Sequence, residues 1–281
     1  MSTFLHGGNV QANGIRQHYL RYGSHGTQNR PALILIPGIT SPAITWGFVA
    51  ERLGQHFDTY VLDARGRGLS STGPDLDYGV DACSDDIGAF AEAMGIKSYH
   101  LVGHSMGARF AVRSSVRKPK GLQSLVLIDP PVSGPGRREY PSKLPWYVDS
   151  IRQSLVGMDA NAMRAFCATW TEEQLQVRAE WLHTCYEPAI VRAFNDFHDV
   201  DFHQDLPHLP VPALLIVAGR GGVILPEDEA EIRELQPAIK IAHVENAGHM
   251  IPWDDLEGFF AAFGDFLGQV LTDNQNKGDR L

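Results

Sequence analysis

Short apolar runs alternate along the chain with longer stretches in which apolar and polar residues mix. The runs hold four to six mostly apolar residues and lack the strict apolar and polar alternation of a half-exposed strand. Strands buried on both faces have this pattern, and helical stretches between them favour a parallel sheet. The runs are 32–36, 59–62, 99–102, 125–128, 213–217 and 239–244. The pattern therefore predicts the α/β class.

Both ends of the chain depart from this pattern. The residues up to about Tyr22 predict an antiparallel edge hairpin with Asn13-Gly14 as its turn, because Asn-Gly favours the tight turns that join two strands. At the other end, residues 272–281 read TDNQNKGDRL, and so polar a segment has little apolar surface to bury. We expect this tail to be disordered.

The alternation also stops between residues 131 and 209. A Pro-rich segment, PPVSGPG, is followed by helical, aromatic-rich sequence. We interpret residues 131–209 as a helical cap inserted into a sheet domain that comprises residues 1–130 and 210–271. The aromatic residues of this insertion are Trp146, Tyr147, Phe166, Trp170, Trp181, Tyr186, Phe194 and Phe197.

Composition and charge limit the possible partners. The chain has 281 residues, 43% of them hydrophobic, which suits one globular domain with an insertion. Asp and Glu outnumber Lys and Arg by 33 to 24, so a nucleic-acid partner is disfavoured, whereas a small anion could bind in a locally basic pocket. The sequence does not indicate the oligomeric state.

The chain start and the cysteines bear on location. The N-terminal residues lack the basic and apolar regions of a signal peptide, and no window approaches the roughly 20 apolar residues that span a bilayer. Cys83, Cys167 and Cys185 are widely spaced, which suits reduced thiols better than disulfides or a zinc site. We expect a cytoplasmic protein without membrane contact or metal.

The sequence Gly103-His-Ser-Met-Gly107 has the G-x-S-x-G pattern of a nucleophile elbow. The elbow needs a serine on a strained turn between a strand and a helix, with flanking glycines where side chains would collide. Here an apolar run leads into the motif, and a helix-compatible segment follows it and stops at Pro119. We predict that Ser105 is a nucleophile; the alternative is a tight turn with an idle serine.

His249 is the candidate general base. A serine hydroxyl needs a base within hydrogen-bond reach, and His249 lies in NAGHMIP, directly after the run 239–244. The alternative is a surface histidine. We expect His104 to pack beside the nucleophile, and the cap histidines to line a pocket or face solvent. These are His183, His198, His203 and His208.

The acid that would orient His249 is not where such an acid commonly stands. A Gly-x-x-Asp-x-x-x-Pro arrangement is expected after the run 213–217, but Gly222 occupies the acid position between Gly219 and Pro226. Asp129 follows the run 125–128, at a strand end that would face the ligand crevice, so we predict Asp129 as the acid. Asp129 could instead cap the Pro-Pro turn that follows it.

Two further predictions concern the groups around the reacting atoms. Asp228 or Glu227 is the rival acid, although acidic residues also suit the start of a helix. An oxyanion hole needs two backbone N–H groups, one after the nucleophile and one after an earlier strand. Met106 and Ile39 occupy these positions.

Taken together, the motifs PGI, DARGRGLS, GHSMG and AGHM make the chain resemble the α/β-hydrolase superfamily over essentially its whole length. The resemblance implies a mostly parallel sheet flanked by helices. The segments SPAITWGFVAERL, GHSMGARF, DPPVSGPGRREYPSKLPWYVDSIRQ and AGRGGVI look more narrowly like the N-formylmaleamate deformylases of bacterial nicotinic-acid degradation. In that family the triad is Ser, Asp and His, which carries onto Ser105, Asp129 and His249.

The narrower resemblance implies hydrolysis of the formyl amide bond of N-formylmaleamate to maleamate and formate, through a formyl-enzyme and without a cofactor. The substrate carboxylate calls for a cation in the pocket. Candidates are Arg109, Arg137, Arg138 and Lys143, each with an alternative role as a solvated or paired residue. We expect Arg65 and Arg67 to hold the DARGRGLS loop in place.

Other functions remain open on the same fold. An esterase or a carbon–carbon bond hydrolase of ring-cleavage products would share every one of these motifs, because function depends on the cap pocket and not on the fold. A ligand receptor or a cofactor-free oxygenase could also keep the triad geometry without hydrolysing a substrate.

Overall fold

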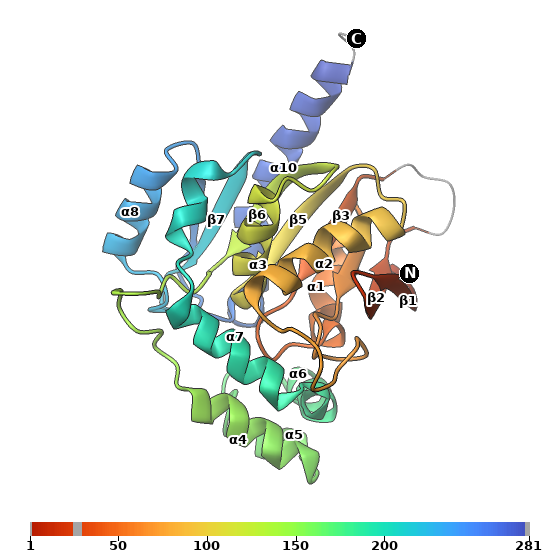
Figure 1. Cartoon of the computed structure of the whole chain (residues 1–281), viewed down its shortest axis with the longest axis vertical. Coiled ribbons are helices and arrows are strands. Elements are labelled where there is room, and N and C mark those ends of the chain that lie inside the picture. Colours follow the sequence, from red (N-terminus) through yellow and green to blue (C-terminus); the bar gives the residue numbers. More distant parts are fainter. Residues whose placement is uncertain (1, 25–29, 279–281) are drawn as a thin grey trace.

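The computed structural model describes residues 2–24 and 30–278, and these residues form an eight-stranded sheet (Figure 1). Its order is β1-β2-β4-β3-β5-β6-β7-β8, with β1, β2 and β4 paired antiparallel and the remaining pairs parallel. The predicted α/β class with a mostly parallel sheet is confirmed. The strands are β1 (Phe4–Ala12), β2 (Ile15–Tyr22), β3 (Ala32–Ile36), β4 (Asp58–Leu62), β5 (Tyr99–His104), β6 (Leu122–Ile128), β7 (Ala213–Ala218) and β8 (Lys240–Val244).

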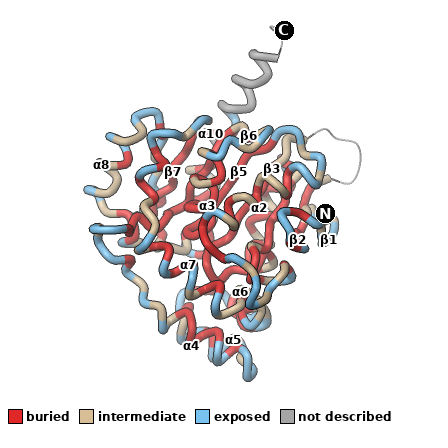
Figure 2. The backbone as a smooth tube through the Cα atoms, viewed as in Figure 1, coloured by how far each residue is buried: buried red, intermediate tan, exposed pale blue. Residues whose placement is uncertain are grey.

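The central strands form where the apolar runs predicted them. Every residue of β5 and β7 is buried, because helices cover both faces of the sheet (Figure 2). The edge hairpin β1–β2 also forms as predicted, and Asn13 and Gly14 both adopt the positive φ that its turn requires.

Helices pack on both sides of this sheet. Figure 1 shows α2 and α3 in front of the sheet and α10 behind it, while α1 contacts β2 and β4. The helices of this layer are α1 (Gly47–Leu53), α2 (Val80–Ala93), α3 (Met106–Val116), α8 (Pro226–Leu235), α9 (Ile251–Asp254) and α10 (Leu256–Gly278). Among the described residues, no helix is long and apolar enough to cross a bilayer.

Helices make up much of the segment between β6 and β7. Its helices gather at one end of the sheet (Figure 1). They are α4 (Leu144–Leu155), α5 (Ala160–Met163), α6 (Glu172–Trp181) and α7 (Glu187–Asp199), with short 3-10 turns at Leu182–Thr184 and at His203–His208. A further 3-10 turn, Ala43–Trp46, precedes α1.

The C-terminal segment differs from the predicted disordered tail. The structure continues α10 through residues 272–278, because a helix that has already begun gains one backbone hydrogen bond for each further residue that it fixes. Residues 279–281 of the predicted tail lie outside the described residues.

Candidate active site

Ser105 lies on the turn between β5 and α3. Its backbone has φ 54° and ψ −118°, a conformation that is costly for a residue with a side chain and is found at functional turns. Gly103 and Gly107 flank the turn because space is absent there: a Cβ at Gly107 would overlap the carbonyl oxygen of Ile36, and one at Gly103 would overlap the backbone of Gly107. The strand, turn and helix that the motif predicts are therefore present.

Replacing Gly107 with alanine is expected to lower the free energy of unfolding by about 2–3 kcal/mol, because β3 and α3 must separate to admit the methyl group. Urea unfolding followed by circular dichroism measures the change. Gly264→Ala in α10 is the matched control, since nothing lies within 4 Å of a Cβ there. Equal stability of the two variants would contradict the close approach at the elbow.

Three predicted residues form a continuous hydrogen-bonded chain. The Ser105 hydroxyl lies 2.9 Å from Nε2 of His249, and Nδ1 of His249 lies 2.7 Å from Oδ2 of Asp129. When Nδ1 carries the proton and donates it to the carboxylate, Nε2 is free to accept the hydroxyl proton. This is the geometry that activates a serine.

Asp129 is fully buried at the tip of β6, with a positive φ of 44° that turns its side chain toward His249. Its backbone N–H donates to Ile216, and its Oδ1 accepts a bond of 3.3 Å from the N–H of Ala218 on β7. The carboxylate is thus fixed by the neighbouring strand and not only by the histidine.

The rival acids point elsewhere. Oδ2 of Asp228 accepts the backbone N–H of Leu225 at 2.8 Å at the start of α8 and pairs with Arg138 at 2.6 Å. Glu227 is exposed. Gly222, at the usual acid position, is also exposed and has φ of 64°, a left-handed turn that glycine adopts readily.

The two predicted oxyanion donors flank the serine. Met106 is the first residue of α3, so its N–H lies in the part of a helix that has no acceptor within the helix. Ile39 follows the turn after β3, and Gly38 lies so close that a Cβ there would be 3.5 Å from the Ser105 Cβ. Neither backbone N–H donates to any other described residue. Both are therefore available to a developing oxyanion.

His104 packs beside the site, as predicted. Its ring centroid lies 5.1 Å from that of His249, and its Nε2 donates to the His249 carbonyl at 3.0 Å. Burial lowers the pKa of His104 to about 3, so the ring is neutral at physiological pH and adds no charge beside His249. His104 thus holds the loop that carries His249, the predicted base.

The model of the alpha/beta hydrolase family matches residues 33–262, which include all three residues of the hydrogen-bonded chain. The chain belongs to this family. An N-formylmaleamate deformylase from Pseudomonas putida is 75% identical over 272 residues, covering 97% of this chain and 100% of the relative. The narrower resemblance predicted from the sequence is confirmed.

Solved structures agree with the family assignment. The crystal structure of an N-formylmaleamic acid deformylase from Pseudomonas putida, a serine-to-alanine variant, is 52% identical with a TM-score of 0.88, covering 92% of this chain and 100% of that one. An E-2-(acetamidomethylene)succinate hydrolase, 21% identical with a TM-score of 0.76, covers 94% of this chain and 99% of that one and shares the fold.

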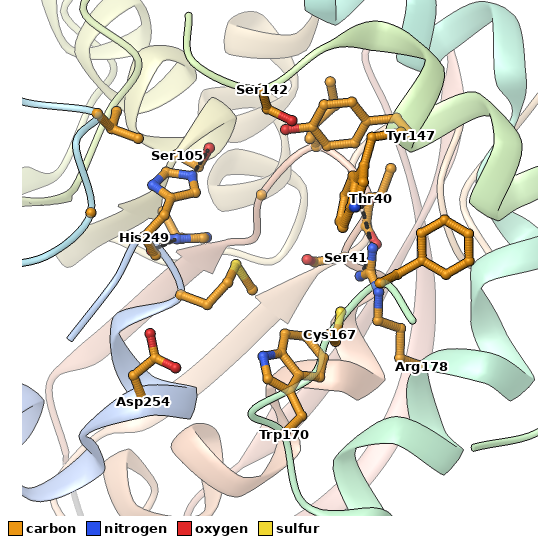
Figure 3. Close-up of a pocket in the computed structure, with 18 of the residues that line it drawn as sticks. Thr40, Ser41, Ser105, Ser142, Tyr147, Cys167, Trp170, Arg178, His249 and Asp254 are labelled. Atoms are coloured by element: carbon orange, nitrogen blue, oxygen red, sulfur yellow. Dashed lines mark hydrogen bonds between the residues drawn. The ribbon is translucent and has the colours of Figure 1, made fainter. Parts of the chain in front are cut away.

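In this alpha/beta hydrolase, a cavity of about 430 Å³ opens onto Ser105 and His249. Its walls come mainly from the loop after β3, the cap and the loop around His249, and the cap supplies several aromatic side chains (Figure 3). The predicted cap aromatics that line it are Trp146, Tyr147, Phe166 and Trp170, whereas the four cap histidines do not. Among the described residues, no group of three His, Cys, Asp or Glu could hold a metal.

The four cations predicted to bind the substrate do not line this cavity. Arg109 is buried, but both terminal nitrogens donate to backbone carbonyls, among them Pro131 at 2.8 Å and Asp196 at 3.0 Å. It ties α3 to the cap, because a guanidinium can satisfy several carbonyls at once. The prediction for Arg109 is corrected on this basis.

The other three predicted cations are paired at the surface. Arg137 makes a two-bond ion pair with Glu231, at 2.7 Å for each bond. Arg138 pairs with Asp228, and Lys143 pairs with Glu139, four residues earlier in the chain. Their alternative role as salt-bridged residues is the one the structure shows, because the cap base in which they lie faces α8 and solvent.

Arg65 and Arg67 hold the DARGRGLS loop, as predicted. Arg65 pairs with Asp86 in the interior at 2.5 Å, and Arg67 donates to the carbonyl of Ile39 at 3.0 Å. The bond to Ile39 also fixes the turn that carries one of the two predicted oxyanion donors.

Two residues that the sequence analysis did not select lie in the cavity. Arg178 of α6 is the one arginine or lysine among the described residues that line it, and Figure 3 shows it on the side away from Ser105 and His249. Tyr140, from the loop before α4, places its hydroxyl 3.2 Å from Nε2 of His249. Burial raises the pKa of Tyr140 well above its usual value, so the phenol stays protonated and can donate a hydrogen bond.

Proposed function

We propose that this chain is a deformylase that hydrolyses N-formylmaleamate to maleamate and formate. The substrate is inferred from the 75% identity, over 97% of the chain, to an N-formylmaleamate deformylase. The chemistry is supported separately by the bonds of 2.9 Å and 2.7 Å that join Ser105, His249 and Asp129. We further propose that the reaction serves nicotinate breakdown in the cytoplasm.

In the proposed reaction, the Ser105 hydroxyl attacks the formyl carbon while Nε2 of His249 takes its proton. The N–H groups of Ile39 and Met106 stabilise the negative charge on the formyl oxygen. The carbon–nitrogen bond then breaks, and His249 returns the proton to the departing amide nitrogen, which releases maleamate. Because a second acyl group withdraws electrons from that nitrogen, it leaves more readily than the nitrogen of a simple amide.

The second half of the reaction releases formate. The formyl group remains as an ester on Ser105, and His249 takes a proton from a water molecule that attacks it. Collapse of the tetrahedral intermediate returns a proton to the serine oxygen and frees formate. Residues 131–209 act as the cap that shields this ester and shapes the acyl pocket, and Asp129 stabilises the imidazolium formed in each half.

The direct experiment is formate release from N-formylmaleamate by the purified protein, measured with a coupled formate dehydrogenase assay. We expect kcat/KM for this substrate to exceed that for simple acyl esters and for a ring-cleavage diketone by at least about 100-fold. Ester turnover at an equal or higher kcat/KM would assign the pocket to an esterase instead.

Replacing Tyr140 with phenylalanine is expected to lower kcat/KM about 10-fold, because the Tyr140 oxygen, 3.2 Å from Nε2 of His249, can accept a hydrogen bond from the imidazolium that forms during attack, and this bond is lost without changing the cavity shape. Steady-state rates across the pH range measure this effect. Tyr147→Phe is the matched control, because the Tyr147 side chain also lines the cavity, but its hydroxyl contacts the Tyr140 hydroxyl, at 3.5 Å, and not His249. A Tyr140→Phe enzyme with wild-type kinetics would remove the phenol from the mechanism.

A further inference from the structure

We propose that Arg178 binds the carboxylate at the end of the substrate away from the formyl group and so restricts the pocket to anionic acyl amides. The proposal rests on the proposed function for the orientation of the substrate, but the anion site itself is argued from the structure. Arg178 belongs to α6 of the cap and is only 3% exposed, yet its side chain lines the cavity that opens onto Ser105 (Figure 3).

The guanidinium of Arg178 has unused hydrogen-bonding capacity. It has five N–H donors, of which one bonds the carbonyl of Thr40 at 2.9 Å and another bonds the Thr40 hydroxyl at 3.0 Å. Its Nε has no hydrogen-bond partner although it is buried. Both acceptors at Thr40 are neutral, and no carboxylate of the described residues lies within ion-pair distance of Arg178.

A buried cation without a counter-ion is expensive, because it has lost its hydration and gained no opposite charge. The other buried arginines in the protein are compensated more fully. Arg65 has the carboxylate of Asp86, and Arg109 has four backbone carbonyls. Arg67 has no carboxylate either, but it donates to three backbone carbonyls and to the Met106 sulfur, and it does not line the cavity. Arg178 therefore stands out as a cation whose missing partner is an anion that enters the cavity.

Aromatic rings fix the plane of this guanidinium. Trp170 and Trp146 lie with ring centroids 5.6 Å and 5.9 Å from its central carbon. Such contacts favour the charged group and limit its rotation. A fork held in this way suits a planar carboxylate, which accepts two parallel bonds from one guanidinium.

The position of Arg178 also connects substrate binding to the reacting end of the cavity. The residue that it bonds, Thr40, directly follows Ile39, whose N–H is one of the two oxyanion donors in the proposed mechanism. A carboxylate bound to Arg178 would thus contact the same guanidinium that holds Thr40, and with it the loop after β3 that contains Ile39. A substrate with one carboxylate and a formyl amide at its opposite end can contact both features.

Binding of two small molecules tests the anion site without any turnover. Maleamate carries the carboxylate, and maleamide is its neutral analogue of nearly the same shape. By isothermal titration calorimetry, we expect the wild-type protein to bind maleamate at least about 10-fold more tightly than maleamide. Arg178→Gln is expected to weaken maleamate binding about 100-fold with little change for maleamide. Arg178→Lys, which keeps the charge but not the fork, should lose about 10-fold.

Arg138→Gln is the control, because Arg138 is a nearby cation that lies outside the cavity, and it should keep the wild-type preference for maleamate. Kinetics give a second readout: Arg178→Gln should lower kcat/KM for N-formylmaleamate at least about 10-fold more than kcat/KM for its methyl ester. Loss of the bonds to Thr40, or misfolding, would lower both values by the same factor. Equal wild-type affinity for maleamate and maleamide, or an Arg178→Gln protein with wild-type maleamate affinity, would overturn the proposal. Absence of formate release by a wild-type protein that still prefers maleamate would reject the deformylase and leave the anion site standing.

Discussion

Ser105→Ala is expected to reduce kcat for formyl-amide hydrolysis by about 10⁵- to 10⁶-fold, which corresponds to about 7–8 kcal/mol in the activation free energy. In the proposed mechanism, the hydroxyl oxygen of Ser105 forms the bond to the formyl carbon. Neither His249 nor a water molecule can replace this hydroxyl unless the site rearranges. The residual rate comes from the oxyanion donors and from binding, which the substitution leaves in place.

Single-turnover formate release and labelling with a fluorophosphonate measure this loss. The wild-type protein should take up one fluorophosphonate on Ser105, and the variant none. Ser142→Ala is the matched control, because Ser142 also lines the cavity and Figure 3 shows it near Tyr147. A Ser105→Ala protein that keeps more than a hundredth of the wild-type kcat would show that the nucleophile is another group.

The sheet could be predicted from the sequence wherever apolar residues alone fill a strand. The run 32–36 coincides with β3, since every residue in it faces a covered side of the sheet and Pro37 ends the pattern. The run 125–128 misses the first residues of β6, which begins at Leu122. Ser124 is polar yet fully buried there, and its hydroxyl is bonded to His100 on β5 at 2.8 Å. A pattern of apolar residues cannot predict a strand residue that is buried through a side-chain hydrogen bond of this kind.

The candidate triad could be predicted because each member stands next to a strand end, and the carboxyl ends of parallel strands meet at one edge of the sheet. The absence of an acid at Gly222 favoured Asp129 over the rivals Asp228 and Glu227, and the structure brings Asp129 to His249. For these three residues, their position next to a strand end was therefore enough to predict that they come together.

The cap residues could not be predicted in the same way. Arg178 lies in α6, whose sequence EEQLQVRAEW is mostly polar and resembles a solvated helix, yet the helix turns this one cation into the cavity. Tyr140 lies in a loop, and a loop has no regular spacing of apolar residues from which its path could be predicted. Conversely, Arg109 follows Ser105 by one helical turn, but its length carries the charge past the cavity to the cap carbonyls. Side-chain direction in the cap depends on packing between distant segments.

Asp129→Asn is expected to lower kcat about 10⁴-fold while KM changes little, because substrate contacts are preserved. The carboxylate of Asp129 accepts the Nδ1 proton of His249, which leaves Nε2 unprotonated toward Ser105. An amide in this position can donate its N–H to Nδ1 and thereby favour the tautomer with the proton on Nε2. That tautomer cannot accept the serine proton, and the imidazolium formed during attack would also lack its negative partner.

Asp228→Asn tests the rival acid under the same conditions. It should keep kcat within about twofold and lose only stability, since Asp228 caps α8 through Leu225 and pairs with Arg138. Steady-state kinetics on both variants, with circular dichroism as the check on folding, separate the two acids. If Asp228→Asn were inactive and Asp129→Asn active, the hydrogen bond of 2.7 Å between Asp129 and His249 would be structural, and the acid would act from the loop after β7. The complete burial of Asp129 argues instead that Asp129→Asn is the inactive variant. A carboxylate with no exposed surface depends on a charged partner such as the imidazolium, whereas Asp228 is already paired with Arg138 at the start of α8.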